Sequence, residues 1–174
     1  MLGSIYYYDY VSSTNNEAKN LAEKYKITSG LVVADCQKHG RGRFGKKWTS
    51  IKGNFMGSFF FPVKNYKEVS KMQHLSLNIL LKCFKKIFKS TIFKIKEPND
   101  ILIGDRKISG ILIESFKVNS QLFVIVGMGI NLVKNPMLSE YKTTNLYKEF
   151  KKKMSVLNFS KILIKEMESV YKCS

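Results

Sequence analysis

The residues best suited to chemistry lie in one short stretch, Gln37-Lys38-His39-Gly40-Arg41-Gly42-Arg43-Phe44-Gly45-Lys46-Lys47-Trp48. Three glycines within six positions allow a loop to bring its backbone N–H groups close to a ligand. Two arginines supply planar groups that match phosphate or carboxylate oxygens, and the chain has only one other arginine, Arg106. The stretch therefore predicts an anion-binding loop, with a flexible surface turn as the alternative.

Two segments before and after this stretch carry polar side chains that suit a binding site. Ser13, Thr14 and Asn15 offer hydroxyl and amide groups, but their position before a helical pattern also suits helix capping. Asn99 and Asp100 follow a proline, where a turn-forming role is the alternative to catalysis.

Two basic or glycine-containing segments follow. Lys107 and Gly110 open an apolar run, and Lys107 is either a site cation or a solvated hairpin lysine. Gly127, Gly129 and Asn131 close another apolar run, which suits close approach of the backbone to a ligand or a plain strand end.

Hydrophobic periodicity predicts the elements that must position these residues. Strands are predicted at 5–11, 31–36, 54–63, 91–96, 101–103, 107–118 and 121–126. Helices are predicted near 14–27, at 68–88 with Leu75 on its inner face, at 145–150, and finally after a cap at Asn158. Because the strands mostly follow one another as hairpins, we expect an α+β fold with a mixed, largely antiparallel sheet covered by helices on one face.

Composition limits the classes of protein that this chain can belong to. The chain has 174 residues, which suits one domain, and no apolar run approaches the roughly 20 residues that span a bilayer. Cys36, Cys83 and Cys173 have no metal-ligand spacing, and the first residues lack the pattern of a signal peptide, so we expect a cytoplasmic protein with reduced thiols. The net charge of +17 fits an acidic partner or anionic substrate, nucleic acid, or a lysine-rich compositional bias.

In this order the segments resemble the catalytic domain of biotin protein ligases, and the resemblance covers nearly all of the chain. The matching residues are Gln37, Gly40-Arg41-Gly42-Arg43, Gly45 and Trp48, then Lys96, Pro98-Asn99-Asp100, Lys107 and Gly110-Ile111-Leu112, and then Gly127, Gly129, Ile130 and Asn131. The resemblance implies a fold like that of class II aminoacyl-tRNA synthetases. It also implies an ATP-dependent enzyme that converts biotin to biotinyl-5'-AMP and transfers biotin to a lysine of a biotin carboxyl carrier domain.

The resemblance also implies roles for individual residues. Lys107, Arg41, Arg43 and Asp100 are expected to be catalytic. The expected biotin-binding residues are Ser13, Thr14, Asn15, Gln37, Gly40, Arg41, Gly42, Arg43, Lys107, Gly110 and Gly127. The expected nucleotide-binding residues are Arg43, Trp48, Asn99, Lys107, Gly129 and Asn131. No motif provides a metal site by itself, so Mg²⁺ is expected to arrive with ATP, near Asn99.

The chain departs from the family pattern at one residue and in its length. Glu97 stands where the family usually has an aromatic residue, which would put a carboxylate at the rim of the site. We expect one domain over residues 1–174, without the N-terminal DNA-binding module or C-terminal β-barrel domain of many members. A monomer or a homodimer, with no DNA and no membrane as partners, fits this expectation.

Two other functions remain as alternatives. A lipoate or octanoate protein ligase would share the fold and the adenylation chemistry, although its glycine-rich sequence differs. A basic nucleic-acid-binding protein is supported only by the net charge.

Overall fold

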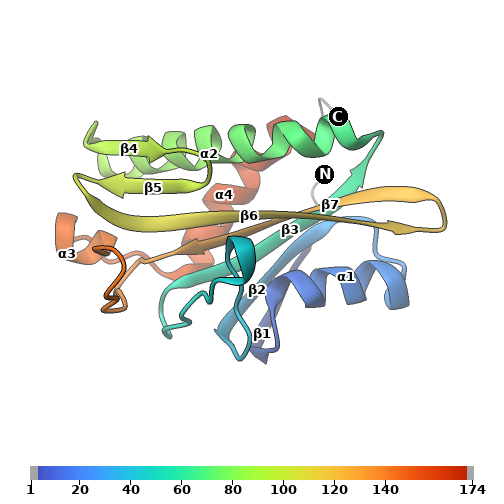
Figure 1. The fold of residues 1–174 in the computed structure, drawn as a ribbon, viewed down its shortest axis with the longest axis horizontal. Helices are drawn as coiled ribbons and strands as arrows, with labels where there is room; N and C mark the ends of the chain where they lie inside the picture. Colours follow the sequence, from blue (N-terminus) through green and yellow to red (C-terminus); the bar gives the residue numbers. More distant parts are fainter. Residues whose placement is uncertain (1–3, 172–174) are drawn as a thin grey trace.

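The protein is built on one seven-stranded sheet, whose strands follow one another in Figure 1 from β4 at the top to β1 at the bottom. The computed structural model describes residues 4–171. Its elements are β1 (Ser4–Val11), α1 (Thr14–Tyr25), β2 (Gly30–Gln37), a 3₁₀ turn η1 (Arg43–Gly45), β3 (Phe55–Val63), α2 (Tyr66–Phe88), β4 (Phe93–Lys96), β5 (Asp100–Ile103), β6 (Arg106–Val118), β7 (Gln121–Ile130), α3 (Leu146–Phe150) and α4 (Val156–Tyr171). The spatial order is β1-β2-β3-β7-β6-β5-β4, with β1 and β2 parallel and the other neighbours antiparallel. The predicted α+β class and mixed, largely antiparallel sheet are confirmed.

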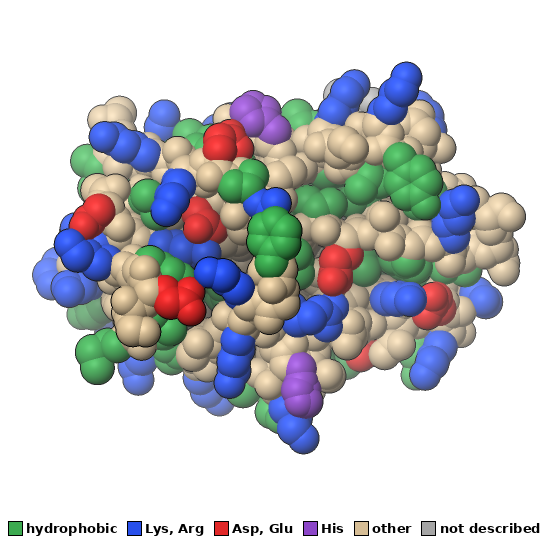
Figure 2. Space-filling view, viewed as in Figure 1, with side chains coloured by type: hydrophobic (Ala, Val, Ile, Leu, Met, Phe, Trp, Pro, Cys, Tyr) green, Lys and Arg blue, Asp and Glu red, His purple; other side chains and the backbone are tan. Residues whose placement is uncertain are grey.

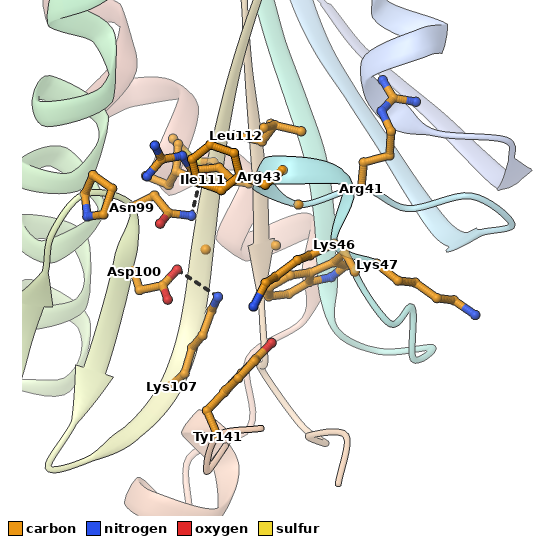
Figure 3. Close-up of a pocket in the computed structure, with 18 of the residues that line it drawn as sticks. Arg41, Arg43, Lys46, Lys47, Asn99, Asp100, Lys107, Ile111, Leu112 and Tyr141 are labelled. Atoms are coloured by element: carbon orange, nitrogen blue, oxygen red, sulfur yellow. Dashed lines mark hydrogen bonds and ion pairs between the residues drawn. The ribbon is translucent and has the colours of Figure 1, made fainter. Parts of the chain in front are cut away.

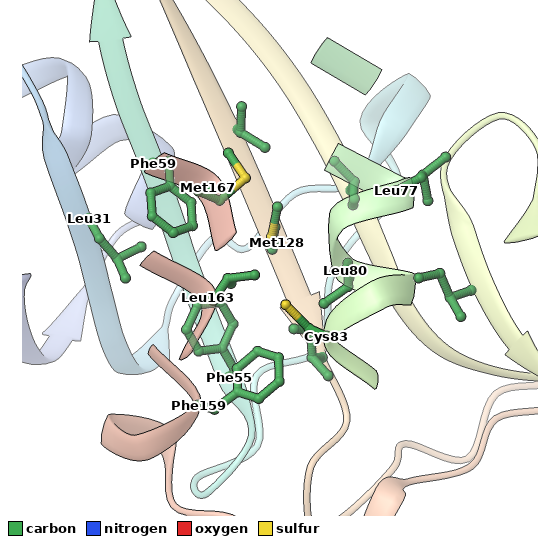
Figure 4. Close-up of a cluster of buried hydrophobic side chains, with 14 of the residues drawn as sticks. Leu31, Phe55, Phe59, Leu77, Leu80, Cys83, Met128, Phe159, Leu163 and Met167 are labelled. Atoms are coloured by element: carbon green, nitrogen blue, oxygen red, sulfur yellow. The ribbon is translucent and has the colours of Figure 1, made fainter. Parts of the chain in front are cut away.

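The larger apolar core lies between the sheet and helices α2 and α4 (Figure 4). Alternation along β3 sends Phe59 and Phe61 to this side, where they are fully buried among side chains of both helices. Each such side chain stabilises the fold by about 1.5–3 kcal/mol through removal of apolar surface from water. The two long helices therefore stabilise the central strands through this core.

Helix α1 packs on the opposite face of the sheet. Its Ala18, Leu21 and Ala22 contact Val32 of β2 and Phe60 of β3 in a second, smaller cluster. The prediction that helices cover only one face was wrong, because β2 and β3 are apolar on both faces.

Strand β7 is longer than predicted and contains the glycines expected to terminate it. It continues to Ile130, which pairs with Phe55 of β3 and Ser109 of β6. Gly127 and Gly129 are thus inside the sheet, where their missing side chains leave room on one face.

Two details of the helices also differ from the sequence-based expectation. Leu75 is 38% exposed, because α2 packs against both the sheet and α4 and its buried stripe extends to Leu77 and Phe84 instead. The last helix begins at Val156, and Asn158 donates its backbone N–H to the Ser155 hydroxyl, so Ser155 has the capping role predicted for Asn158.

Cys173 lies outside the described residues. Over residues 4–171 no helix has the length and hydropathy needed to cross a membrane.

Candidate active site

A cavity of about 440 Å³ occupies the part of the sheet face that α1 leaves uncovered. Its lining comes from several segments: the N-terminal end of α1, the loop of residues 40–48 (the glycine loop), the corner before β5, strands β6 and β7, and residues 140–142. Every predicted site residue lines it except Gly40 and Asn131. Four segments that are distant in sequence thus meet at one site.

One end of the cavity is polar and mostly uncharged. The Gln37 side-chain oxygen accepts hydrogen bonds from the backbone N–H of Thr14 at 2.8 Å and from its hydroxyl at 3.0 Å. Gln37 therefore satisfies the first backbone donor of α1, whereas Ser13, at the cap position, makes no side-chain capping bond. The Ser58 hydroxyl lies 2.7 Å from the Thr14 hydroxyl and 2.5 Å from the Asn15 amide oxygen.

Two glycines of β7 make room for side chains from other elements. A Cβ atom at Gly127 would overlap the amide of Asn15, and one at Gly129 would overlap the ring of Trp48. Because these glycines face the cavity from the same side of the strand, they account for its floor. The groups that approach these glycines in the structure are side chains of the protein, Asn15 and Trp48, and the approach of a ligand remains a prediction.

A buried ion pair forms the other end of the cavity (Figure 3). Nζ of Lys107 lies 2.8 Å from Oδ1 of Asp100, and the two side chains are only 15% and 18% exposed. A Cβ atom at Gly110 would come within 3.2 Å of this ammonium, so the glycine gives the pair its space. The prediction that Lys107 is a site residue, and not a solvated hairpin lysine, agrees with this placement.

Two aromatic rings flank the Lys107 ammonium. It lies 5.7 Å from the ring centre of Trp48 and 5.2 Å from that of Tyr141, distances at which a cation is attracted to the ring face. Burial and then the charge of Asp100 raise the pKa of Tyr141, so its phenol stays protonated at neutral pH. Tyr141 was not predicted, since a lone tyrosine in a polar stretch gives no sequence signal.

The glycine loop is narrow, and hydrogen bonds within its own backbone hold its two arms together. The N–H of Gly42 donates to the carbonyl of Lys46 at 2.6 Å, and that of Trp48 donates to Gly40 at 2.9 Å. These two donors are therefore used inside the loop, contrary to the simple picture of a cradle of free N–H groups. At the tip, Phe44 has a positive φ of 55° and is 89% exposed.

The two arginines of the loop point in different directions (Figure 3). Arg43 lies toward Asn99 and Ile111 and packs on the Phe44 ring at 4.8 Å, and it has no carboxylate partner among the described residues. Arg41 leads away from Lys107 and forms an ion pair with Glu114 at 3.2 Å. Arg43 is therefore available to bind an anion, whereas the Arg41 side chain is already bound by Glu114.

Further charged residues lie around the mouth of the cavity. Lys46 of the loop pairs with Glu140 at 3.1 Å, and Lys142 pairs with Asp105 at 2.7 Å. Both pairs are largely exposed, so each contributes little stability.

The sequence analysis did not identify Glu114, Ser58 and Lys46 as residues in or beside the site. Glu114 and Ser58 do carry a visible signal: Glu114 directly follows the apolar run Ile111-Leu112-Ile113, and Ser58 interrupts an apolar strand.

Three predicted placements need correction or restriction. Glu97 does not line the cavity; it faces His74 of α2 at 3.5 Å, with 62% of its side chain exposed. Gly40 packs against Trp48 and Gln37. The buried Asn131 amide donates to the Thr144 carbonyl at 3.0 Å. That Gly40 and Asn131 contact a ligand remains a prediction.

The cavity offers few ligands for a resident metal ion. Within residues 4–171 no group of three or more His, Cys, Asp or Glu side chains is arranged to hold one. Asp100 is engaged by Lys107.

The sequence is similar to known proteins over most of its length. The model of the Biotin/lipoate A/B protein ligase family matches residues 7–131. The chain is 34% identical over 133 residues to the bifunctional ligase/repressor BirA of Bacillus subtilis, which covers 75% of this chain and 41% of the relative. It is also 34% identical over 128 residues to biotin–protein ligase 2 of Arabidopsis thaliana, covering 71% of this chain and 39% of the relative. The chain thus spans about two fifths of the length of these relatives.

Solved structures agree with this assignment. The biotin protein ligase of Aquifex aeolicus in complex with biotin and ATP superposes with a TM-score of 0.76 at 29% identity, covering 95% of this chain and 69% of that one. The biotin protein ligase of Leishmania major in complex with biotinyl-5-AMP has a TM-score of 0.82 at 22% identity, over 94% of this chain and 73% of that one, which shows the shared fold. The chain belongs to the biotin/lipoate A/B protein ligase family.

Proposed function

We propose that this protein is an ATP-dependent biotin protein ligase. The observation that carries the proposal is the cavity with two chemically different ends. Thr14, Asn15 and Gln37 supply neutral hydrogen-bonding groups at one end, and Lys107 and Arg43 supply cations at the other. A biotin molecule has the matching polarity, because its ureido ring is uncharged and its carboxylate lies at the far end of an alkyl chain. The Arabidopsis thaliana and Aquifex aeolicus proteins described above are biotin protein ligases by name.

The first step of the proposed reaction joins biotin to AMP. An oxygen of the biotin carboxylate attacks the α-phosphorus of ATP, a new P–O bond forms, and the bond to pyrophosphate breaks. Negative charge accumulates on the phosphoryl oxygens and on the leaving pyrophosphate, so preorganised cations lower the barrier. The proposal gives this role to Lys107, and it is supported by the position of its ammonium between Asp100, Trp48 and Tyr141.

The second step transfers biotin to a lysine of a carrier domain. The lysine nitrogen attacks the anhydride carbonyl, and the C–O bond to AMP breaks. The amine must lose a proton on the way, and Asp100 is the carboxylate at the reacting end of the cavity that can accept or orient it. A closed glycine loop would protect the anhydride from water during this exchange.

Mg²⁺ belongs to the proposal as a companion of ATP. Side-chain oxygens of Asn99 and Asp100 in the cavity would contribute ligands, and the phosphates would supply the others. ATP and carrier domains are expected in the cytoplasm, so we place the activity there. A biotin carboxyl carrier domain is the proposed acceptor, and a monomer or homodimer remains the expected state.

Biotin-dependent exchange of labelled pyrophosphate into ATP tests the first step directly. We expect exchange that saturates with biotin and requires Mg²⁺. The same assay with lipoate or octanoate tests the alternative ligase, and exchange with those acids but not with biotin would overturn the proposal in favour of that enzyme. DNA retention that fades at moderate salt, without exchange for any acid, would instead support the nucleic-acid-binding alternative.

A further inference from the structure

Glu114 contacts two parts of the candidate site at once. It lies on β6 opposite Ile125 of β7, on the face that bears the cavity. Its Oε2 accepts a hydrogen bond from Nδ2 of Asn15 at 2.7 Å, and both carboxylate oxygens lie 3.2 Å from Nη2 of Arg41. About a third of each side chain in the Arg41–Glu114 pair is exposed, so water screens the pair only in part.

Arg41 connects this carboxylate to the base of the glycine loop. Its backbone pairs with that of Lys47, where the two arms of the loop meet. Nη2 of Arg41 also donates to Oδ1 of Asn16 at 3.0 Å. Through Glu114 and Asn16, the arginine therefore ties the loop to β6 and to the first turn of α1.

Asn15 receives its orientation from the same carboxylate. Because its Nδ2 donates to Glu114, its Oδ1 is turned to the Ser58 hydroxyl at 2.5 Å. This amide lies directly over Gly127, at the neutral end of the cavity. Asn15 and Arg41 thus both donate hydrogen bonds to the Glu114 carboxylate. An uncharged glutamine at position 114 would present its own N–H donor to one of these two donors.

We infer that Glu114 is a positioning residue that binds Arg41 and Asn15 together and so holds the glycine loop against the biotin end of the site. Arg41 then acts as a support for the loop, and Arg43 and Lys107 are the groups that meet the anions. The biotin part of this inference rests on the function proposed above. The tie between the loop and β6 does not depend on it.

A double-mutant cycle between Glu114 and Arg41 tests the inference. In the pyrophosphate exchange assay we expect Glu114→Gln and Arg41→Gln each to raise the KM for biotin by about tenfold, with kcat changed by about threefold or less. The double variant should be no worse than Glu114→Gln, because Arg41 has no tie to β6 left to lose once the Glu114 carboxylate is gone. Multiplied effects, or a loss of ATP affinity in Arg41→Gln alone, would overturn the inference and make Arg41 an anion ligand.

Amide hydrogen exchange of residues 40–48 in the ligand-free protein provides the readout that is independent of function. Both variants should exchange faster in this loop than the unaltered protein. Glu166→Gln is the matched control, since it removes a carboxylate held by two lysines on the other side of the sheet and should leave the loop unchanged. Because Arg41 lies at the base of a surface loop, Arg41→Gln is expected to fold, and it can still be compared with the unaltered protein if Glu114→Gln does not fold. If amide hydrogens of the loop exchange equally fast in all variants and in the unaltered protein, the tie is overturned. If the unaltered protein shows no biotin-dependent exchange of pyrophosphate into ATP, only the proposed function is overturned.

Discussion

Lys107 and Asp100 are the two charged side chains on which the cavity depends most directly. Each is mostly buried and each is the nearest partner of the other, so removing one leaves an uncompensated charge. A loss of activity after one substitution would therefore mix chemistry with stability, and the experiment has to separate the two.

We predict that Lys107→Met lowers kcat for biotin-dependent pyrophosphate exchange by about 100-fold or more, the scale of removing one preorganised group at a developing charge. Biotin affinity measured without ATP should fall much less, because the ammonium is needed most in the transition state. The variant should also lose about 1–3 kcal/mol of unfolding free energy through the unpaired Asp100.

Adding Asp100→Asn to Lys107→Met is the control for stability. The double variant should recover most of the unfolding free energy in urea titrations but none of the activity. Equal losses of biotin affinity and kcat in Lys107→Met would contradict a role in the transition state and reduce Lys107 to a binding residue.

Gly127 and Gly129 permit a paired test, because they face the same side of β7 but adjoin different ends of the cavity. Gly129→Ala should displace Trp48 and shift the protein's tryptophan fluorescence, which comes from this single tryptophan. Gly127→Ala should disturb Asn15 and raise the KM for biotin while the emission stays unchanged. Each variant is expected to lose about 1–3 kcal/mol by overpacking. An emission shift in Gly127→Ala as large as that in Gly129→Ala would show that the two ends are not separate.

At the level of elements, local patterns predicted most of the strands and helices, and the errors arose where packing decides. The apolar character of β2 and β3 on both faces could have indicated α1 on the second face, but periodicity does not say which helix covers which side. Gly127 and Gly129 looked like a strand end because glycine weakens strands in isolation. Only the side chains of Asn15 and Trp48, which are far away in sequence, explain why the strand continues.

The residues of the candidate site also fall into two groups, those that the sequence identifies and those that only the folded structure brings to the site. Arg43 belongs to a rare residue type in this chain and Lys107 to a motif with Gly110, so both could be assigned from sequence to the segments that form the cavity. The partner of Arg41 could not be assigned, because Glu114 is 73 positions away and pairing between strands brings it near. Tyr141 depends on how the segment after β7 lies beside the first residues of β6, which no local pattern records.

Helices α2 and α4 are joined by a carboxylate between two lysines, and this gives a prediction for stability. Hydrogen bonds and charges from Lys82 and Lys86 hold the pKa of Glu166 below its ordinary value of 4.5. A lowered pKa means that its contribution is present above about pH 4.5 and is lost as the pH falls through the folded-state value.

The Tm of the unaltered protein should therefore exceed that of Glu166→Gln by about 2–4 °C at pH 7, corresponding to about 1 kcal/mol for a mostly exposed pair of lysines. The difference should shrink toward zero as the pH falls below 4.5 and through the lowered folded-state pKa of Glu166. Thermal melts of both proteins at several pH values measure this difference. A difference that persists unchanged at low pH would show that Glu166 stabilises the helices by packing alone.

At the scale of the whole molecule, positive charge is the dominant property. The chain has 30 lysines and arginines against 13 acidic residues, and Figure 2 shows the cationic side chains spread over the visible face without gathering into one patch. Such a field attracts an acidic partner from many directions and is screened by salt, since the Debye length falls from about 14 Å at 0.05 M to about 6 Å at 0.3 M ionic strength. Under the proposed function, the partner attracted is the carrier domain.

We predict that transfer of biotin to an acidic carrier domain slows by about tenfold or more between 0.05 M and 0.3 M salt, because association is steered by the charge of the whole protein. Pyrophosphate exchange at saturating ATP and biotin should change by about twofold or less, since its charges act at short range inside the cavity. Single-turnover transfer from preformed biotinyl-AMP separates the two measurements. A carrier whose acidic residues are replaced by amides is the control and should show a weaker dependence on salt. Equal salt dependence of transfer and exchange would contradict steering and leave the +17 charge as a feature of composition.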